Sequence, residues 1–404
     1  MRPPPTIDGL PSPEPEDRER SLALVERVRA EAISRGGVLG FDRYMAIALY
    51  EPGLGYYASG SGKFGPGGDF VTAPELGALF AACIATQLER WFAAGVPPIV
   101  WEFGAGSGAL ASQLLAEFAA RGVAVEVCIV ELSAPLRARQ RERIAALGPA
   151  ALERVRWFDR RPDAIGGAVL ANELLDALPV RLFEIPGGGD STVFERVIRP
   201  DPGGPGLVLD SVAADPTFAS LIDQRLASAG WPLARGPGRY RSEVGEQASA
   251  WVTTIAERQQ SGVMLHIDYG FPATEYSPPQ RADGTLNCHY RHRSHADPLW
   301  WPGLNDITAH VDFSAVRASA LAAGLSCIGY GSQASFLLGC DFAAHFAARA
   351  GAGALAQASL AREANMLVSE AEMGELFKVI ALARTVQGQS LGFAGRDRQQ
   401  ALGD

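Results

Sequence analysis

Short apolar segments alternate with helical segments between residues 99 and 172, and this alternation limits the possible folds more than any other feature of the sequence. The expected elements are strands at 99–103, 125–131, 155–158 and 168–172, helices at 109–121 and 134–147, and further strands at 263–269, 326–330 and 377–382. Strands alternating with helices indicate a parallel sheet with helices on both faces. The sequence therefore predicts an α/β fold with a doubly wound, mostly parallel, seven-stranded sheet, whose ligands bind beyond the carboxyl ends of the strands.

Interruptions of this pattern divide the chain into expected regions. These are a disordered tail at 1–20, a helical and glycine-rich covering region at 21–95, the core at 96–178 and 261–385, an inserted β/helical subdomain at 179–260, and a C-terminal tail at 386–404. The first region is rich in Pro, Asp and Glu, a composition that cannot build a core. The fold thus carries an N-terminal helical extension and an internal insertion.

Charge and apolar content exclude several classes of function. A net charge of −9 argues against a nucleic-acid partner held by phosphate contacts. No apolar run is long enough to span a bilayer, so we expect no membrane insertion. The start lacks a charged-then-apolar leader and the acid-poor character of a mitochondrial transit peptide. The five cysteines form no C-x-x-C pair, which fits a reducing compartment. We therefore predict a cytoplasmic location.

A glycine-rich loop follows the first strand of the sheet. The strand at 99–103 runs directly into Gly104-Ala105-Gly106-Ser107-Gly108, and a helix follows. Glycines there let a ligand approach the backbone closely, although such a loop alone is weak evidence. Glu102 lies two residues before the first glycine, where its carboxylate could bind an amino group. Glu131 closes the next strand, where it could accept both hydroxyls of a ribose.

A dehydrogenase is the alternative, because Gly104, Gly106 and Ala109 also satisfy G-x-G-x-x-A. A pyrophosphate favours an uncluttered helix N-terminus, and Glu102 places a negative charge nearby. A sulfonium with an ammonium group tolerates that charge far better. The remaining alternative is that the glycines only permit the helix to pack on the strand. We favour a nucleoside cofactor of the S-adenosylmethionine type.

Seven ordered motifs between about residues 38 and 382 carry a family resemblance. They are Gly55-Tyr56-Tyr57, Gly68-Asp69-Phe70-Val71-Thr72-Ala73-Pro74-Glu75, the loop from Glu102 to Gly108, Asn172-Glu173-Leu174-Leu175-Asp176-Ala177-Leu178-Pro179, Asp268-Tyr269-Gly270, Gly284-Thr285-Leu286, and Asp306-Ile307-Thr308-Ala309-His310-Val311-Asp312-Phe313. In these stretches the chain resembles the MidA-like family of class I methyltransferases, which includes mitochondrial assembly factors of respiratory complex I.

The resemblance implies a Rossmann-like protein-arginine methyltransferase that uses S-adenosyl-L-methionine. Eukaryotic members of this family symmetrically dimethylate an arginine of a catalytic-core subunit of complex I. The expected partner is thus a protein with an accessible arginine, and a complex I subunit is the candidate. The family loop often reads G-P-G-R-G, whereas this chain has Ala105 and Ser107. Both acids and the glycines are retained, so cofactor binding is expected to survive this departure.

An arginine acceptor requires carboxylates, because its guanidinium is always protonated and is bound in a forked geometry. The candidate catalytic residues are Glu173, Asp176, Asp69 and Asn172. Helix capping is the structural alternative for Glu173 and Asp176, and turn formation is the alternative for Asp69. The expected cofactor-binding residues are Glu102, Gly104, Ala105, Gly106, Gly108, Glu131, Leu132, Thr72, Pro74 and Glu75.

The histidines His289, His292 and His295 invite a metal-site hypothesis. Neighbouring arginines would oppose a metal ion, and a closed zinc site would lack cysteine partners. We therefore expect no metal, and we interpret the segment as a substrate-gating loop. Two alternatives for the whole protein stay open: a small-molecule O- or N-methyltransferase, and a non-catalytic assembly factor that binds the cofactor.

Overall fold

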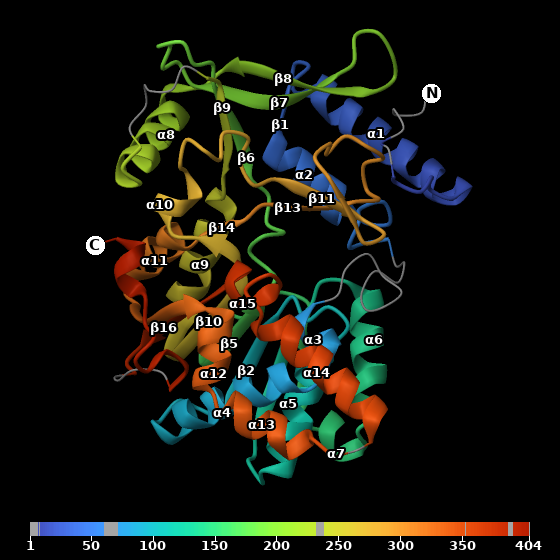
Figure 1. Cartoon of the computed structure of the whole chain (residues 1–404). Helices are drawn as coiled ribbons and strands as arrows, with labels where there is room; N and C mark the ends of the chain where they lie inside the picture. Colours follow the sequence, from blue (N-terminus) through green and yellow to red (C-terminus); the bar gives the residue numbers. More distant parts are fainter. Residues whose placement is uncertain are drawn as a thin grey trace. The chain divides into compact units, whose positions relative to one another are not determined.

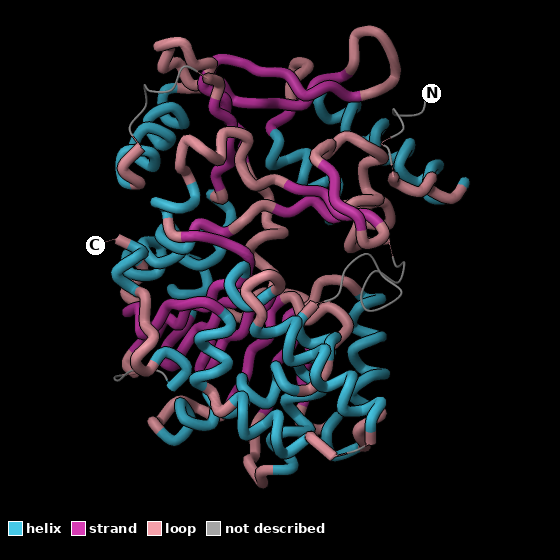
Figure 2. Tube along the Cα trace, viewed as in Figure 1, coloured by secondary structure: helices cyan, strands magenta, loops and turns pink. Residues whose placement is uncertain are grey.

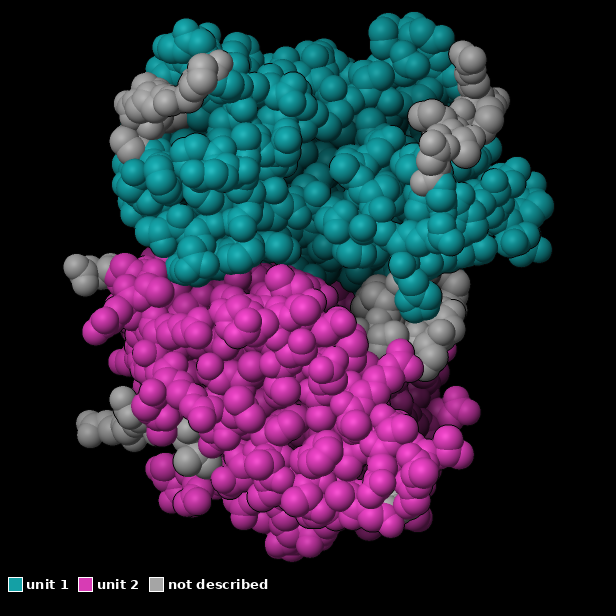
Figure 3. Space-filling model, viewed as in Figure 1, with its two compact units in different colours: residues 1–70, 176–249, 271–312 teal, residues 71–175, 250–270, 313–404 magenta. Residues whose placement is uncertain are grey.

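A computed structural model describes residues 7, 9–59, 72–231, 238–351, 353–386 and 391–403 of the chain. The chain divides into two compact units, which Figure 3 colours teal and magenta. Unit 1 comprises residues 1–70, 176–249 and 271–312, and unit 2 comprises residues 71–175, 250–270 and 313–404. Each unit has a β-sheet and a hydrophobic core of its own.

Unit 2 contains the sheet that the alternating pattern predicts (Figure 1). Its strands are hydrogen-bonded in the order β15 (Ser326–Ser332), β16 (Phe377–Arg384), β10 (Gln259–Phe271), β5 (Ile165–Asn172), β2 (Ile99–Phe103), β3 (Glu126–Val130) and β4 (Val155–Phe158). The strands from β10 to β4 are parallel, and β16 is antiparallel to both of its neighbours. The prediction of a doubly wound, mostly parallel sheet is confirmed, and the seven expected strands form its continuous order. The sheet has an eighth strand, the two-residue β14 (Val311–Asp312), which pairs with β10 outside this order.

The direction of chain winding reverses between β2 and β5. From β2 the chain proceeds outward through β3 to β4, and it then returns to β5 on the other side of β2. In open α/β sheets, ligands bind in the crevice at the carboxyl ends of the strands that flank such a reversal. We therefore expect a ligand-binding site at the residues that follow Phe103 and Asn172.

Helices accompany this sheet, as the tube in Figure 2 shows. They are α3 (Ala73–Leu76), α4 (Leu79–Ala93), α5 (Ala109–Ala120), α6 (Ala134–Ala145), α7 (Pro149–Leu152), most of α9 (Glu246–Arg258), α11 (Phe313–Ala322), α12 (Gln333–Gly339), α13 (Phe342–Arg349), α14 (Ala354–Val368) and α15 (Met373–Leu376). None of the helices in the described part of the chain is long and apolar enough to cross a membrane.

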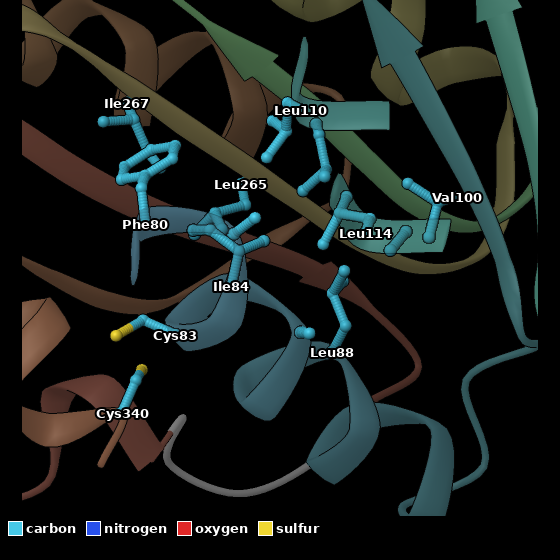
Figure 4. Close-up of a cluster of buried hydrophobic side chains, with 14 of the residues drawn as sticks. Phe80, Cys83, Ile84, Leu88, Val100, Leu110, Leu114, Leu265, Ile267 and Cys340 are labelled. Atoms are coloured by element: carbon cyan, nitrogen blue, oxygen red, sulfur yellow. The ribbon is translucent and has the colours of Figure 1, made fainter. Parts of the chain in front are cut away.

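The core of unit 2 lies between helix α4 and the sheet. Phe80 and Ile84 of α4 belong to one buried hydrophobic cluster with Leu265 and Ile267 of β10 (Figure 4). All of these side chains are at most 3% exposed. Alternate residues of β10 supply this cluster, as a strand that packs one face against helices requires. The cluster packs the central strands against α4.

Unit 1 is built on antiparallel strands. One sheet has the order β1 (Leu39–Gly40), β7 (Phe194–Pro200), β6 (Arg181–Ile185) and β9 (Tyr240–Val244), with β8 (Leu207–Ala213) paired to β7. A smaller sheet has the order β12 (Arg293–His295), β11 (Asn287–Tyr290) and β13 (Asp306–Thr308), and the short strand β14 (Val311–Asp312) follows. The helices are α1 (Pro15–Ser34), α2 (Phe41–Tyr50), α8 (Pro216–Ser228) and α10 (Ala273–Tyr276).

Three distant chain segments share the core of unit 1. Met45 of α2, Leu182 of β6 and the pair Cys288 and Ile307 of the small sheet lie in one buried cluster. The sequence placed residues 271–312 with the core of the large sheet, and the structure places them in unit 1 instead. Local patterns report the type of an element but not its partner, because register and packing with distant segments decide that.

Both chain ends differ from the expected tails. Helix α1 begins at Pro15, with Glu16 and Asp17 in its first turn, where proline and acidic residues stabilise a helix start. Residues 391–403 include the short 3₁₀ helices η1 (Leu391–Phe393) and η2 (Gln399–Leu402). Phe393 is 1% exposed and lies in the core of unit 2. Isolated apolar residues have no periodicity, so the sequence did not indicate this packing.

Candidate functional site

The glycine loop connects β2 to α5 in unit 2. Gly104, Gly106 and Gly108 have φ values of 71°, 51° and 80°, in the left-handed region that favours glycine. A Cβ atom at Gly104 would lie 3.0 Å from the Leu174 side chain, and one at Gly108 would lie 3.2 Å from the Gln140 side chain. Ala105, between these glycines, is 7% exposed. The backbone conformation thus favours glycine at all three positions, and close packing further favours glycine at Gly104 and Gly108.

Glu102 is the acid at the end of β2. Its side chain is 4% exposed, and burial raises its pKa to about 8 despite a hydrogen bond from the backbone of Ala111. Among the described residues, no group donates a hydrogen bond to its Oε2 atom. A buried carboxylate without full hydrogen bonding is stabilised by a nearby cation. Glu102 therefore fits a ligand that carries an ammonium or sulfonium charge.

Glu131 follows β3, the neighbour of β2. Its Oε1 accepts a hydrogen bond from the backbone N–H of Ser133 at 2.9 Å, and burial raises its pKa. The next residue, Leu132, is 76% exposed although it is apolar. A carboxylate beside an exposed apolar side chain at the carboxyl edge of the sheet fits a ribose and its base.

Gln140 connects these two parts, and the sequence interpretation missed it. Its Nε2 donates to the carbonyl oxygen of Gly106 at 3.0 Å and to Glu131 Oε2 at 3.2 Å. Its Oε1 accepts from Trp157 Nε1 at 3.1 Å. Gln140 and Ile144 form the buried face of α6, four residues apart. That spacing in an otherwise charged helix was the available signal.

The carboxylate of Glu75 is already engaged by protein groups. Arg143 donates to both of its oxygens, at 2.9 and 3.2 Å, and the Ser107 hydroxyl donates to it as well. Burial alone would raise the pKa of Glu75, but these hydrogen bonds outweigh it and hold the pKa below its usual value. Glu75 thus ties α3 to the glycine loop.

The other candidates of this segment are only partly described. The carbonyl oxygen of Thr72 accepts from Glu75 N at 2.9 Å, and that of Pro74 accepts from Gln113 Nε2 at 2.8 Å. The second contact positions α3 beside α5, which carries Gln113. Asp69 lies outside the described residues.

The carboxyl end of β5 forms a tight turn. Glu173 has φ = 51°, a left-handed conformation that is uncommon outside glycine, and Asn172 Nδ2 donates to Glu173 Oε1 at 3.0 Å. Asp268, which is 1% exposed, accepts hydrogen bonds from the backbone N–H groups of Leu174 and Leu175 at 3.2 and 2.8 Å. No helix occurs among the described residues 173–180, so the helix-capping interpretation of Glu173 and Asp176 is wrong. The sequence matched Asp268 to a motif without assigning it this role.

Asp176 belongs to unit 1 rather than to the unit that carries the glycine loop. Its backbone oxygen accepts from Ala309 N at 3.0 Å. In the same unit, Tyr57 donates to Asp306 Oδ1 at 2.8 Å and stacks on Tyr50 at 5.6 Å between ring centroids. Burial, and then the carboxylates of Asp306 and Asp176, raise the pKa values of both tyrosines. Asp176 is thus part of a cluster of acids and tyrosines.

The remaining motifs have structural explanations within unit 1. Buried Glu243 accepts from Thr285 N at 2.9 Å, from Thr285 Oγ1 at 2.6 Å and from Tyr276 at 2.8 Å. A Cβ atom at Gly284 would clash with a carboxylate oxygen of Glu243. This packing explains the glycine and threonine of Gly284-Thr285-Leu286.

Strands β11 and β12 form much of the histidine-rich segment, and its role as a substrate-gating loop stays a prediction. His295 hydrogen-bonds to Asn305 Oδ1 at 3.0 Å, and Trp300 and Trp301 are 3% and 7% exposed. These tryptophans are packing anchors. Within the described residues, no group of three His, Cys, Asp or Glu side chains could hold a metal ion.

Comparisons with known proteins identify the family. Residues 80–331 match the model of a family described as S-adenosyl-L-methionine-dependent methyltransferases. A zebrafish protein named "Protein arginine methyltransferase NDUFAF7, mitochondrial" is 28% identical over 387 residues, 89% of this chain and 86% of the relative. The human protein of the same name is 26% identical over 384 residues, 87% of this chain and 81% of the relative.

A solved protein from Burkholderia thailandensis, bound to S-adenosyl-homocysteine, is 44% identical and covers 98% of this chain and 100% of its own, with a TM-score of 0.90. A second structure from that organism is 42% identical, with the same coverage and a TM-score of 0.88.

The predicted cytoplasmic location is contradicted by these comparisons, because the curated relatives are named as mitochondrial proteins. The prediction rested on free cysteines and on the composition of residues 2–20. Free cysteines indicate a reducing environment but do not identify the compartment.

The cofactor can be assigned from the geometry and the family together. The buried acid Glu102 fits a cationic ligand, and Glu131 with Leu132 fits a nucleoside. The dehydrogenase alternative is therefore set aside. The chain belongs to the family of S-adenosyl-L-methionine-dependent methyltransferases.

Proposed function

We propose that this methyltransferase acts on an arginine side chain of a protein. The observation that carries the proposal is Glu173, a non-glycine residue in the left-handed region at the carboxyl end of β5. This strand flanks the reversal of the sheet, next to the glycine loop after β2. Backbone conformations of this kind persist where the surrounding structure enforces them, often at functional sites. The names of the curated relatives support an arginine acceptor.

In this proposal Glu173 binds the acceptor guanidinium. A carboxylate accepts two parallel N–H bonds from a guanidinium and draws its positive charge towards the bound nitrogens. The Asn172 amide donates to one oxygen of Glu173, and among described residues Asn172 Oδ1 has no donor, so it could accept a further guanidinium N–H. Asp268 holds the turn through the N–H groups of Leu174 and Leu175. The acceptor is thereby positioned, and positioning supplies most of the acceleration of a methyl transfer.

The cofactor residues complete the proposed site. Glu102 would bind the amino group of the methionine moiety and Glu131 the ribose hydroxyls, with the glycine loop against the ligand and Leu132 against the base. When bound, S-adenosylmethionine supplies the methyl group from its sulfonium. Ala105, Thr72, Pro74 and Glu75 would line or support this site. Among the acids outside it, Asp176 and Asp69 stay candidates for acceptor contact.

We further propose that the substrate protein is a subunit of respiratory complex I, as the resemblance to the MidA-like family implies. A positive acceptor suits the net charge of −9 of the chain.

The test combines acceptor discovery with one substitution. The purified protein is incubated with methyl-labelled S-adenosylmethionine and an extract of cells that lack it, and labelled products are identified by mass spectrometry. We expect methylated arginine in a protein. Glu173→Gln should lower kcat by about a hundredfold or more, because it removes a charge that acts on the reacting group. The affinity for S-adenosylhomocysteine should not change.

Glu257→Gln is the matched control, because Glu257 is exposed on α9. Undiminished transfer by Glu173→Gln would remove that residue from the mechanism. A labelled small molecule without labelled protein would favour the small-molecule methyltransferase. Absence of any product under conditions where S-adenosylhomocysteine binds would favour a non-catalytic assembly factor.

A further inference from the structure

We propose that Gln140 is a positioning residue for the cofactor, which holds the ribose-binding carboxylate of Glu131 and the glycine loop in one fixed arrangement. The inference rests on the assignment of Glu131 to the ribose hydroxyls. It does not depend on the identity of the methyl acceptor. One fully buried side-chain amide in unit 2 makes the contacts that support it.

The orientation of the Gln140 amide is determined by its partners. The side chain is 0% exposed, and its Nε2 donates to Gly106 O at 3.0 Å and to Glu131 Oε2 at 3.2 Å. Its Oε1 accepts from Trp157 Nε1, which can only donate. A flipped amide would direct N–H groups at the indole N–H and an oxygen at two acceptors. The amide is therefore held in a single orientation, with both N–H groups in use.

The protein hydrogen bonds to Glu131 determine which acceptor sites of its carboxylate remain for a ligand. Ser133 N donates to Oε1 of Glu131 and Gln140 donates to Oε2, and the backbone of Leu132 adds a third hydrogen bond to the carboxylate. A carboxylate has about four lone-pair sites, so Glu131 keeps capacity to accept from a ribose hydroxyl. Burial raises the pKa of Glu131, and the hydrogen bonds from Ser133 and Gln140 counteract that rise. Gln140 thus both orients the carboxylate and favours its ionised form.

The same side chain also packs on the glycine loop. A Cβ atom at Gly108 would lie 3.2 to 3.3 Å from Gln140 Cγ, Cα and Cβ. Arg141 lies over the ring of Trp157, the donor to Gln140, with its guanidinium carbon 4.1 Å from the ring centroid. Gln140 is consequently supported from β4 and α6 while it contacts the loop and Glu131. A leucine of similar size would fill the space but leave three polar groups without their partner.

The first experiment compares Gln140→Leu with Gln333→Leu. Gln333 is also 0% exposed, lies in the same unit, and donates from Nε2 to Leu367 O at 3.0 Å. Calorimetry measures the Kd for S-adenosylhomocysteine, and thermal unfolding measures the Tm of each variant. Both variants should lose thermal stability. Only Gln140→Leu should weaken binding, by about tenfold to a hundredfold, the range for a lost hydrogen bond to a charged group.

The second experiment asks whether Gln140 acts through Glu131. In a Glu131→Gln background, adding Gln140→Leu should weaken S-adenosylhomocysteine binding by no more than about threefold. For the 2′-deoxy analogue of S-adenosylhomocysteine, Gln140→Leu should likewise cause a smaller loss of affinity than it causes for S-adenosylhomocysteine itself. In Gln140→Glu, the loss of affinity relative to the native protein at the same pH should be larger than in Gln140→Leu near neutral pH. This loss should shrink as the pH falls, because a protonated carboxyl can donate one hydrogen bond to Glu131.

Three results would overturn the inference. One is native affinity in a folded Gln140→Leu protein. Another is that Gln140→Leu weakens S-adenosylhomocysteine binding by the same factor in the native and Glu131→Gln backgrounds. Gln140 would then act only through the glycine loop. The third is equal weakening of binding by Gln333→Leu, which would indicate a general effect of lost stability. All of these measurements are made without a methyl acceptor, so failure of the proposed arginine activity is detected separately.

Discussion

Replacing Glu102 by Gln should make the ligand-free protein more stable and its cofactor binding weaker. Glu102 is buried at the end of β2, and burial raises its pKa from 4.5 to about 8. Glutamine keeps the shape of the side chain and can still accept the hydrogen bond from Ala111. It lacks the charge that burial disfavours and that a cationic ligand requires.

The size of both effects follows from the pKa shift. An acid whose pKa is higher in the folded state destabilises the fold as pH rises above its unfolded pKa, because the unfolded state then loses its proton more readily. At pH 8 and above, the shift of Glu102 from 4.5 to about 8 corresponds to about 5 kcal/mol of lost stability. Glu102→Gln should recover much of this loss at pH 8 and little below pH 5.

Cofactor binding should show the opposite dependence. Between pH 6 and 8 the native affinity for S-adenosylhomocysteine should rise by up to about tenfold per pH unit and then level off, because binding requires ionised Glu102. Glu102→Gln should bind about tenfold to a hundredfold more weakly at pH 8, with a nearly flat pH profile.

Denaturant titrations at pH 5 and pH 8 measure the stability difference. Calorimetry in buffers of different ionisation enthalpy measures the proton released on binding, which should be close to one at pH 7 for the native protein and near zero for Glu102→Gln. The reasoning is refuted if the variant is less stable than the native protein at pH 8. It is also refuted if the variant keeps the native pH profile of binding.

Two further predictions concern the same unit. His266 is 0% exposed, burial lowers its pKa from 6.5 to about 4, and among described residues neither ring nitrogen has a partner. The unfolded state binds the proton more tightly, so the native protein should lose about 3 kcal/mol of stability as the pH falls from 6.5 to 4. Denaturant titrations should show that His266→Leu removes most of this loss. Equal acid sensitivity of the variant and the native protein would contradict the prediction. Gly108 has φ = 80°, so Gly108→Ala should destabilise the protein by about 1 to 2 kcal/mol and weaken S-adenosylhomocysteine binding; native stability and affinity would contradict this.

The large sheet was predictable because its signals are local. Most strands of unit 2 contain a short apolar run, and the acids near two strand ends, Glu102 and Glu131, are visible in the sequence beside a glycine loop or a helix. The assembly of unit 1 was not predictable in this way. Cys288 and Ile307 share a core with Met45, and no local pattern reports a contact between segments so far apart.

Within the site, the residues that the sequence interpretation missed act through other residues. Gln140 lies in a strongly charged helix, and its importance is apparent only once Gly106 and Glu131 are seen on either side of it. Asp268 was recognised as a motif residue, but its hydrogen bonds from Leu174 and Leu175 connect β10 to the turn that follows β5. Such supporting contacts depend on tertiary structure, which spacing along the chain does not encode.

The position of β16 has a consequence for how the protein is made. This strand is among the last elements of the chain, yet it lies between β10 and β15 and pairs with both. Until the ribosome has released residues 377–384, the two neighbouring strands have unpaired edges, which are templates for association with other chains. Truncations that remove this strand should therefore yield aggregates rather than a smaller folded enzyme, and chaperones should be most needed late in synthesis.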